Sequence, residues 1–70
     1  MTTTEKLELI EEVLRVKPNS LTEDTELNTV REWDSLTILS LQVRLSAINP
    51  DLKFDDLFEC DTVGEICEMI

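Results

Sequence analysis

Apolar residues recur at helical spacing near the start of the chain, separated by charged side chains. They are Leu7, Ile10, Val13 and Leu14. Three- and four-residue intervals predict an amphipathic helix with one inward face. Thr2 and Glu5 have the spacing of a capping box, in which the side chain of each residue accepts a hydrogen bond from the backbone N–H of the other. The helix should end before Pro18, because proline disfavours helical geometry in the residue that precedes it.

A denser apolar run follows in the middle of the chain and predicts a second helix from Ser35 to about Ile48, stopped by Asn49 and Pro50. Its apolar residues occupy two faces. One face carries Leu36, Leu39 and Val43, and the other carries Leu41, Leu45 and Ile48. A helix that is apolar on both sides is either central to the fold or partly used for binding.

The connection between these helices, residues 18–33, is long and rich in Thr, Asn, Asp and Glu. Leu21, Leu27 and Val30 are too irregularly spaced for a stable helix. We therefore interpret them as anchors that hold an ordered loop on the core, with room for one short helical turn. A loop of this length is unusual in so small a domain and calls for an explanation.

The last third of the chain predicts a short extended link, one helical turn over residues 55–59 and a final helix. Thr62 and Glu65 give a second capping-box spacing, and Gly64 in the first turn should lower helix stability slightly. The residues expected to face inward are Val63, Ile66, Cys67 and Ile70. The sum is an all-α fold, a small four-helix bundle of three principal helices and one short one, forming a single domain over residues 1–70.

Charge narrows the possible partners. Sixteen acidic residues oppose six basic ones, for a formal net charge of −10. Nucleic acid is an unfavourable ligand, because binding it needs a basic face that displaces counterions. Anionic membranes are disfavoured for the same reason, and no segment is long and apolar enough to span a bilayer. Proteins with basic patches are the expected partners. Without a signal peptide, we expect a cytoplasmic monomer.

The sequence offers little for metal binding or catalysis. It contains no histidine, and its two cysteines, Cys60 and Cys67, are too few for a zinc site. On one short helix they would lie about 10 Å apart, too far for a disulfide, so we expect small buried thiols. The acidic runs lack the glycine and the ligand spacing of a calcium loop. Neither a histidine-dependent triad nor a paired-carboxylate cleft is expected.

The start of the second helix carries the candidate chemistry. Asp34 is a favoured N-cap residue, which leaves Ser35 exposed at the first helical position, where free N–H groups favour an anion. The stretch Asp34-Ser35-Leu36, with Trp33 before it, resembles the phosphopantetheine attachment motif of acyl carrier and peptidyl carrier proteins. The resemblance extends over the whole chain, since that family also has a long loop between its first two helices.

This resemblance implies a non-catalytic carrier. A phosphopantetheinyl transferase would attach 4′-phosphopantetheine from coenzyme A to Ser35, and the thiol of that arm would hold an acyl or aminoacyl group as a thioester. Loading, transfer and condensing enzymes of fatty acid, polyketide or related biosynthesis would be the further partners. In the family the residue matching Asp34 also contacts the transferase, and Leu36 is expected to lie exposed beside the arm.

One departure from the family pattern concerns partner binding. The motif helix of familiar carriers is rich in Glu and Asp, whereas residues 36–48 contain none. We therefore expect partners to dock through apolar contacts of Leu36, Leu39 and Val43. The acidic residues expected nearest the arm are Asp55, Asp56 and Glu59.

Two questions stay open at this point. A rival interpretation is a small acidic helical adaptor that binds a protein through its second helix and carries no arm. The cargo is also open, because fatty acyl, polyketide, aminoacyl and D-alanyl carriers share this layout. The Met1 start and the end just after the last helix favour a free-standing protein over a domain excised from a larger synthase.

Overall fold

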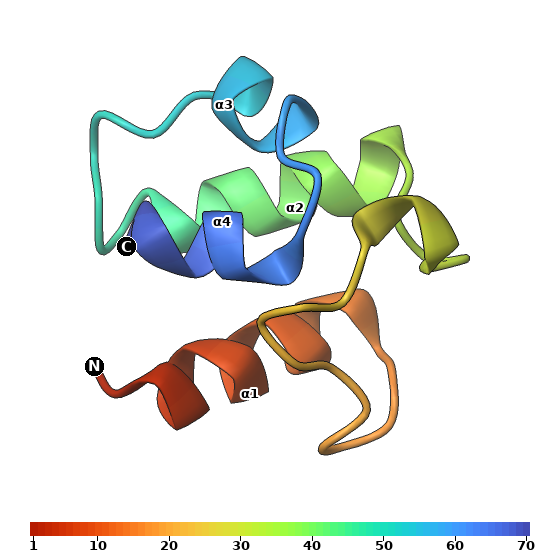
Figure 1. The fold of residues 1–70 in the computed structure, drawn as a ribbon. Helices are drawn as coiled ribbons and strands as arrows, with labels where there is room; N and C mark the ends of the chain where they lie inside the picture. Colours follow the sequence, from red (N-terminus) through yellow and green to blue (C-terminus); the bar gives the residue numbers. More distant parts are fainter.

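A computed structural model describes residues 1–70 as four α-helices and one 3-10 turn, with no strand (Figure 1). The elements are α1 (Thr3–Leu14), η1 (Leu27–Thr29), α2 (Ser35–Leu45), α3 (Phe54–Phe58) and α4 (Val63–Glu68). The predicted all-α bundle is confirmed. Helix α1 packs against α2 and α4, and α3 packs against α2. The start of α2 lies at the end of the molecule opposite both termini.

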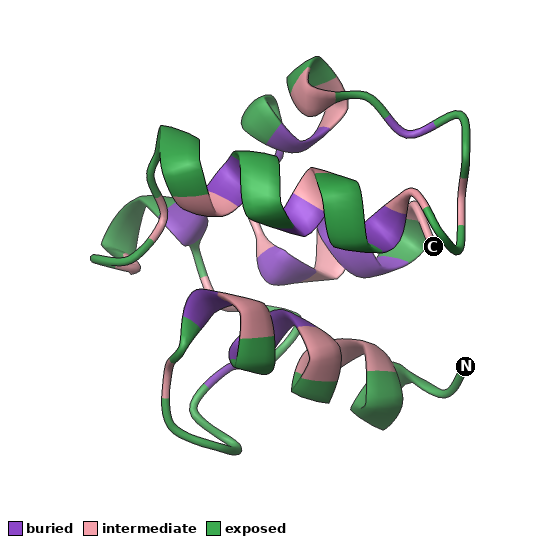
Figure 2. Cartoon of the chain, turned by 180° about the vertical axis from the view of Figure 1, so that it is seen from behind, coloured by how far each residue is buried: buried purple, intermediate pink, exposed green.

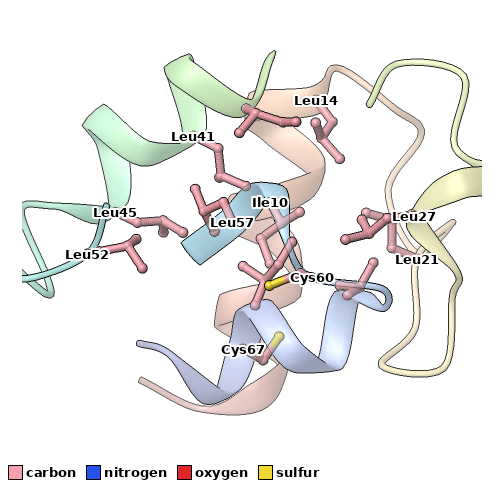
Figure 3. Close-up of a cluster of buried hydrophobic side chains, with 13 residues drawn as sticks. Ile10, Leu14, Leu21, Leu27, Leu41, Leu45, Leu52, Leu57, Cys60 and Cys67 are labelled. Atoms are coloured by element: carbon pink, nitrogen blue, oxygen red, sulfur yellow. The ribbon is translucent and has the colours of Figure 1, made fainter. Parts of the chain in front are cut away.

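The helices and the long loop share one core (Figure 3). Ile10 of α1, Leu41 of α2 and Leu57 of α3 are fully buried, as are Val63 and Ile66 of α4. The other buried apolar residues are Leu14, Leu21, Leu27, Ile38, Leu45, Leu52, Cys60 and Cys67. Leu21 and Leu27 are thus the loop anchors that the sequence predicts, with Val30 partly buried beside them, and η1 is the expected helical turn.

Both predicted ends of α1 are confirmed. The Glu5 amide donates to Thr2 Oγ1 at 3.2 Å and the Thr2 amide to Glu5 Oε1 at 3.1 Å, which completes the capping box. The helix stops at Leu14, where Arg15 takes the left-handed conformation with φ 59°. The buried carboxylate of Glu11 is a feature that the sequence does not predict. It accepts the Leu21 amide proton at 3.0 Å and so fixes the loop to α1.

Helix α2 ends earlier than the sequence predicts, at Leu45 rather than near Ile48. The amides of Ile48 and Asn49 both donate to the Leu45 carbonyl at 2.9 Å, which closes the helix in a turn. Ile48 lies in that turn and outside the helix, so the helical period no longer directs its side chain. Its predicted place on one face with Leu41 and Leu45 was wrong, since those two residues are buried and Ile48 is 43% exposed.

Backbone hydrogen bonds join the long loop to the start of α4. The Leu27 amide donates to the Asp61 carbonyl at 2.8 Å, and the Val63 amide donates to the Thr25 carbonyl at 3.0 Å. The third bond runs from the Gly64 amide to the Glu23 carbonyl at 2.9 Å. Glu26 and Thr62, which lie between the first two of these bonds, form an antiparallel bridge. We call these three bonds the loop ladder. Since the first amides of a helix have no partner within it, the loop itself caps α4.

Gly64 permits a close backbone contact that the sequence does not predict. A Cβ atom at this position would lie 2.8 Å from the Glu23 carbonyl oxygen, which is closer than van der Waals contact allows. The obstacle is backbone that the loop ladder holds in place, so it cannot turn aside as a flexible side chain could. The absence of a side chain at residue 64 is therefore a condition for the loop to approach α4.

The cysteines are buried free thiols, as predicted, but they do not share a helix. Cys67 lies in α4, whereas Cys60 lies between α3 and α4. Burial, together with nearby carboxylates led by Glu65, raises the pKa of Cys60 to about 11. Burial also raises the pKa of Cys67. Both thiols are therefore protonated and weakly nucleophilic at neutral pH.

Two further properties of the fold bear on function. No helix combines the length and the apolar character needed to cross a bilayer. No group of three or more His, Cys, Asp or Glu side chains is arranged to hold a metal ion.

Gly64→Ala tests the close approach of the loop to α4. Helix propensity alone would make alanine stabilising by about 1 kcal/mol. We expect a net loss of about 1–3 kcal/mol instead, because the added methyl group meets fixed backbone. Urea unfolding followed by circular dichroism measures it. Ser40→Ala, at an exposed position of α2, is the control and should be neutral or slightly stabilising. Equal or greater stability of Gly64→Ala would contradict the packing described.

Candidate functional site

The start of α2 is held by a reciprocal cap. Asp34 has extended backbone, with φ −135° and ψ 178°, and its Oδ1 accepts the Thr37 amide proton at 2.9 Å. In return the Asp34 amide donates to Thr37 Oγ1 at 3.2 Å. The predicted N-cap is confirmed, and Thr37 serves in the position where Glu or Gln usually completes a capping box.

The Thr37 hydroxyl also holds the backbone that leads into α2. It lies 2.6 Å from Asp34 Oδ1 and within hydrogen-bond distance of the Glu32 carbonyl, and its single proton can go to one of them at a time. Hydrogen bonds from the Thr37 hydroxyl, and next from the Thr37 amide, hold the pKa of Asp34 below its ordinary value. The carboxylate is therefore ionised at neutral pH, where it complements the positive helix end.

Ser35 is the first residue of α2 and is exposed to solvent. Its hydroxyl makes no hydrogen bond within the chain, so nothing has to be broken before it reacts. Helix N-termini favour negatively charged groups, because the first amides are unpaired and the helix dipole is positive there. An anionic ester on this oxygen would be stabilised both by the unpaired amides and by the helix dipole.

An open cleft of about 670 Å³ lies beside Ser35. One wall is formed by the loop and α2, and the other by the end of α3 and the residues that follow it. The residues that line the cleft are Glu26, Leu27, Asn28, Trp33, Asp34, Ser35, Ile38, Phe58, Cys60, Asp61 and Thr62. The two walls are those that the loop ladder joins through Leu27 and Asp61. Trp33 is partly buried and packs against the core.

Apart from Asp34, the carboxylates that line the cleft beside Ser35 are not the three expected nearest the arm. Glu26 and Asp61 line the cleft, whereas Asp55, Asp56 and Glu59 do not. Asp56 instead turns back on its own helix, where its Oδ2 accepts the Lys53 amide proton at 2.9 Å.

Sequence reasoning missed Glu26, Phe58 and Asp61 as neighbours of Ser35. No periodic signal marks them, because the loop ladder and the turn after α3 bring them together from distant parts of the chain. Phe58 is 61% exposed and packs on Phe54, with ring centroids 6.1 Å apart.

The outer face of α2 carries the predicted apolar stripe. Leu36 is 78% exposed, Leu39 50% and Val43 63%. On the opposite face Ile38, Leu41 and Leu45 are buried, so exposed and buried positions alternate along the helix (Figure 2). The stripe lines a shallow groove between α2 and the end of α1, together with Asp34, Thr37 and Arg44. The structure therefore brings Leu36, Leu39 and Val43 together on one accessible surface.

A small acidic helical bundle whose second helix opens with a capped, exposed serine beside an open cleft has the build of a carrier domain. A family model described as "Phosphopantetheine attachment site" matches residues 7–70, and the chain belongs to this family. Neither the comparison with curated proteins nor that with solved structures returned a match. The family carries covalently attached 4′-phosphopantetheine, so the protein is a phosphopantetheine carrier. An unbonded hydroxyl at a positive helix end fits the phosphodiester of that group.

The cap at Asp34 should make stability depend on pH. The folded pKa of Asp34 lies below that of the unfolded chain, so its contribution is present above the unfolded pKa and is lost as the pH falls through the folded pKa. We expect the stability difference between the native chain and Asp34→Asn to be full at neutral pH and to shrink below about pH 4. Urea unfolding at several pH values measures it. Asp51→Asn, outside the cap, is the control. A difference that grows on acidification would contradict this account of the cap.

Proposed function

We propose that Ser35 is the attachment point of the 4′-phosphopantetheine arm and that the protein tethers acyl or aminoacyl intermediates for delivery to partner enzymes. The observation that carries the proposal is the Ser35 hydroxyl itself, which is exposed, unbonded and placed at the first position of a capped helix. When bound, the arm supplies a thiol that holds the cargo as a thioester.

The chain is expected to be the substrate of the attachment reaction rather than its catalyst. Asp34 is the nearest carboxylate in sequence, and its lowered pKa makes it a weak base for the Ser35 proton. No histidine exists to replace it. The base must therefore come from the phosphopantetheinyl transferase, which supplies the arm from coenzyme A. We propose Asp34 and Leu36 as contacts for this enzyme, since they flank the serine.

The cleft beside Ser35 is our candidate resting place for the arm. Trp33, Ile38 and Phe58 offer apolar surface there, and the cleft is open, so the arm can leave it without unfolding any helix. Both Cys60 and Ser35 line the cleft. The high pKa of Cys60 keeps its thiol protonated, so it should not attack a thioester held nearby.

Loading, transfer and condensing enzymes are the proposed further partners. Their apolar contact surface would be Leu36, Leu39 and Val43, which stand exposed on α2. Asp55, Asp56 and Glu59 lie on or directly after α3, and we propose them as contacts for enzymes that also reach across the cleft. Fatty acid and polyketide biosynthesis are the pathway classes that suit such a carrier, acting as a monomer in the cytoplasm.

Intact-mass measurement tests Ser35 directly. We expect co-expression with a promiscuous phosphopantetheinyl transferase to add the mass of one arm to the native chain and none to Ser35→Ala. Ser40→Ala removes another exposed serine of the same helix and should keep the full gain. Modification that persists in Ser35→Ala would refute the attachment point. No gain with several transferases would favour the rival, an adaptor that binds partners without an arm.

A further inference from the structure

The Thr37 hydroxyl bonds to the short segment that leads into α2. It accepts the Asp34 amide proton at 3.2 Å. It can donate its own proton to Asp34 Oδ1, at 2.6 Å, or to the Glu32 carbonyl, which lies within hydrogen-bond distance. Neither the Asp34 amide nor the Glu32 carbonyl has another hydrogen bond within the chain. One side chain therefore supplies the only such bonds of two backbone groups that precede Ser35.

This arrangement needs a group that both donates and accepts a proton. Glu often completes a capping box, and at position 37 it could accept the Asp34 amide proton. As a carboxylate it has no proton to donate to the Glu32 carbonyl, and it would place a second negative charge against Asp34. A hydroxyl does both tasks without adding charge. Thr37 thus combines a helix cap with a bond to the residue that lies two positions before that cap.

Ser35 depends on its neighbours for its position. Its hydroxyl is exposed and makes no hydrogen bond within the chain, so the surrounding backbone decides where the oxygen lies. On the side that precedes α2, Trp33 packs on the core, while Glu32 and Asp34 are exposed and bond to Thr37. The Thr37 amide and hydroxyl both meet Asp34 Oδ1, which also fixes the direction of that carboxylate beside the serine.

Attachment of the arm is sensitive to where this oxygen is held. In that reaction the Ser35 oxygen bonds to the coenzyme A phosphorus that carries the pantetheine. The phosphoanhydride bond breaks, the adenosine bisphosphate leaves, and the serine proton passes to a base of the transferase. The attacking and leaving oxygens must lie roughly in line, so a displaced serine reacts slowly even when the two proteins bind normally.

We propose that Thr37 is a positioning residue for phosphopantetheine attachment. Its hydroxyl holds Asp34 and the Glu32 carbonyl, so that the transferase meets the Ser35 oxygen in a single orientation. Thr37 does not touch the reacting atoms and acts through the backbone and the Asp34 carboxylate. This inference rests on the proposed attachment at Ser35, and it extends the functional motif by one residue beyond Leu36.

Loss of the hydroxyl should leave α2 itself in place. The residue 37 amide would still donate to Asp34 Oδ1, and the Ile38 amide would still donate to the Asp34 carbonyl, both at 2.9 Å in the native chain. The Asp34 amide and the Glu32 carbonyl belong to exposed residues, so water can replace the lost partner. The attachment rate can therefore change while the helix remains folded.

Steady-state kinetics with coenzyme A, a promiscuous phosphopantetheinyl transferase and the full chain as the varied substrate test the proposal. Thr37→Val replaces the hydroxyl by a methyl group of similar size. We expect kcat to fall about tenfold and the KM for the chain to stay within about twofold, the pattern of a group misaligned after binding. Thr37→Ser restores the hydroxyl and should recover most of the native kcat. Thr37→Ala repeats the deletion with a better helix former, in case Thr37→Val does not fold.

Thr2→Val is the matched control. Thr2 supplies the hydroxyl of the α1 capping box, near the N-terminus and at the end of the molecule opposite the start of α2 (Figure 1). This variant should lower the resistance to urea as Thr37→Val does and leave kcat unchanged. An unchanged kcat in Thr37→Val or Thr37→Ala would overturn the proposal. So would a change in KM alone, failure of Thr37→Ser to recover the rate, or an equal loss of kcat in Thr2→Val.

Failure of this inference is distinguishable from failure of the proposed function. If Ser35 is not the attachment point, the mass gain persists in Ser35→Ala whatever the Thr37 variants do. If Ser35 is the attachment point and Thr37 does not position it, Ser35→Ala blocks the modification while Thr37→Val reacts at the native rate.

Discussion

The loop ladder is the constraint on which the rest of the structure depends. A connection of twenty residues between two helices, Arg15 to Asp34, is expensive to order in a domain of 70 residues. Here its carbonyls satisfy the first amides of α4, so ordering the loop and capping that helix are one event. Leu21 and Leu27 add burial, and Glu11 adds a side-chain bond to the Leu21 amide. The loop is thus packed into the core and is more than a connection between α1 and α2.

The geometry of the candidate site follows from this constraint. The ladder brings Glu26 and Leu27 against Asp61 and Thr62, which are opposite walls of the cleft beside Ser35. The chain then reaches α2 through Trp33 and a cap that leaves the serine hydroxyl outside. The two candidate surfaces lie on the two sides of one helix start: the cleft lies toward α3, and the apolar stripe lies toward α1.

The sequence predicted what depends on local periodicity and capping. The four helices, the N-cap at Asp34, the buried anchors Leu21 and Leu27 and the exposed stripe of α2 all follow from residue spacing. What it could not predict depends on contacts between distant segments. The close approach of Gly64 to Glu23 is one example, and the hydrogen bond from the Leu21 amide to the buried Glu11 carboxylate is another. The placement of Ile48 failed because a turn, not a helix, sets its direction.

Amide hydrogen exchange of the native chain tests the loop ladder most directly. The account predicts that the amides of Leu27, Val63 and Gly64 are protected together and to a similar extent, because each donates across the same contact. Their protection should approach that of buried helical amides such as Leu41. Exchange of these three amides at the rate of an unstructured peptide, while Leu41 stays protected, would show that the loop is not held to α4 and would contradict the account.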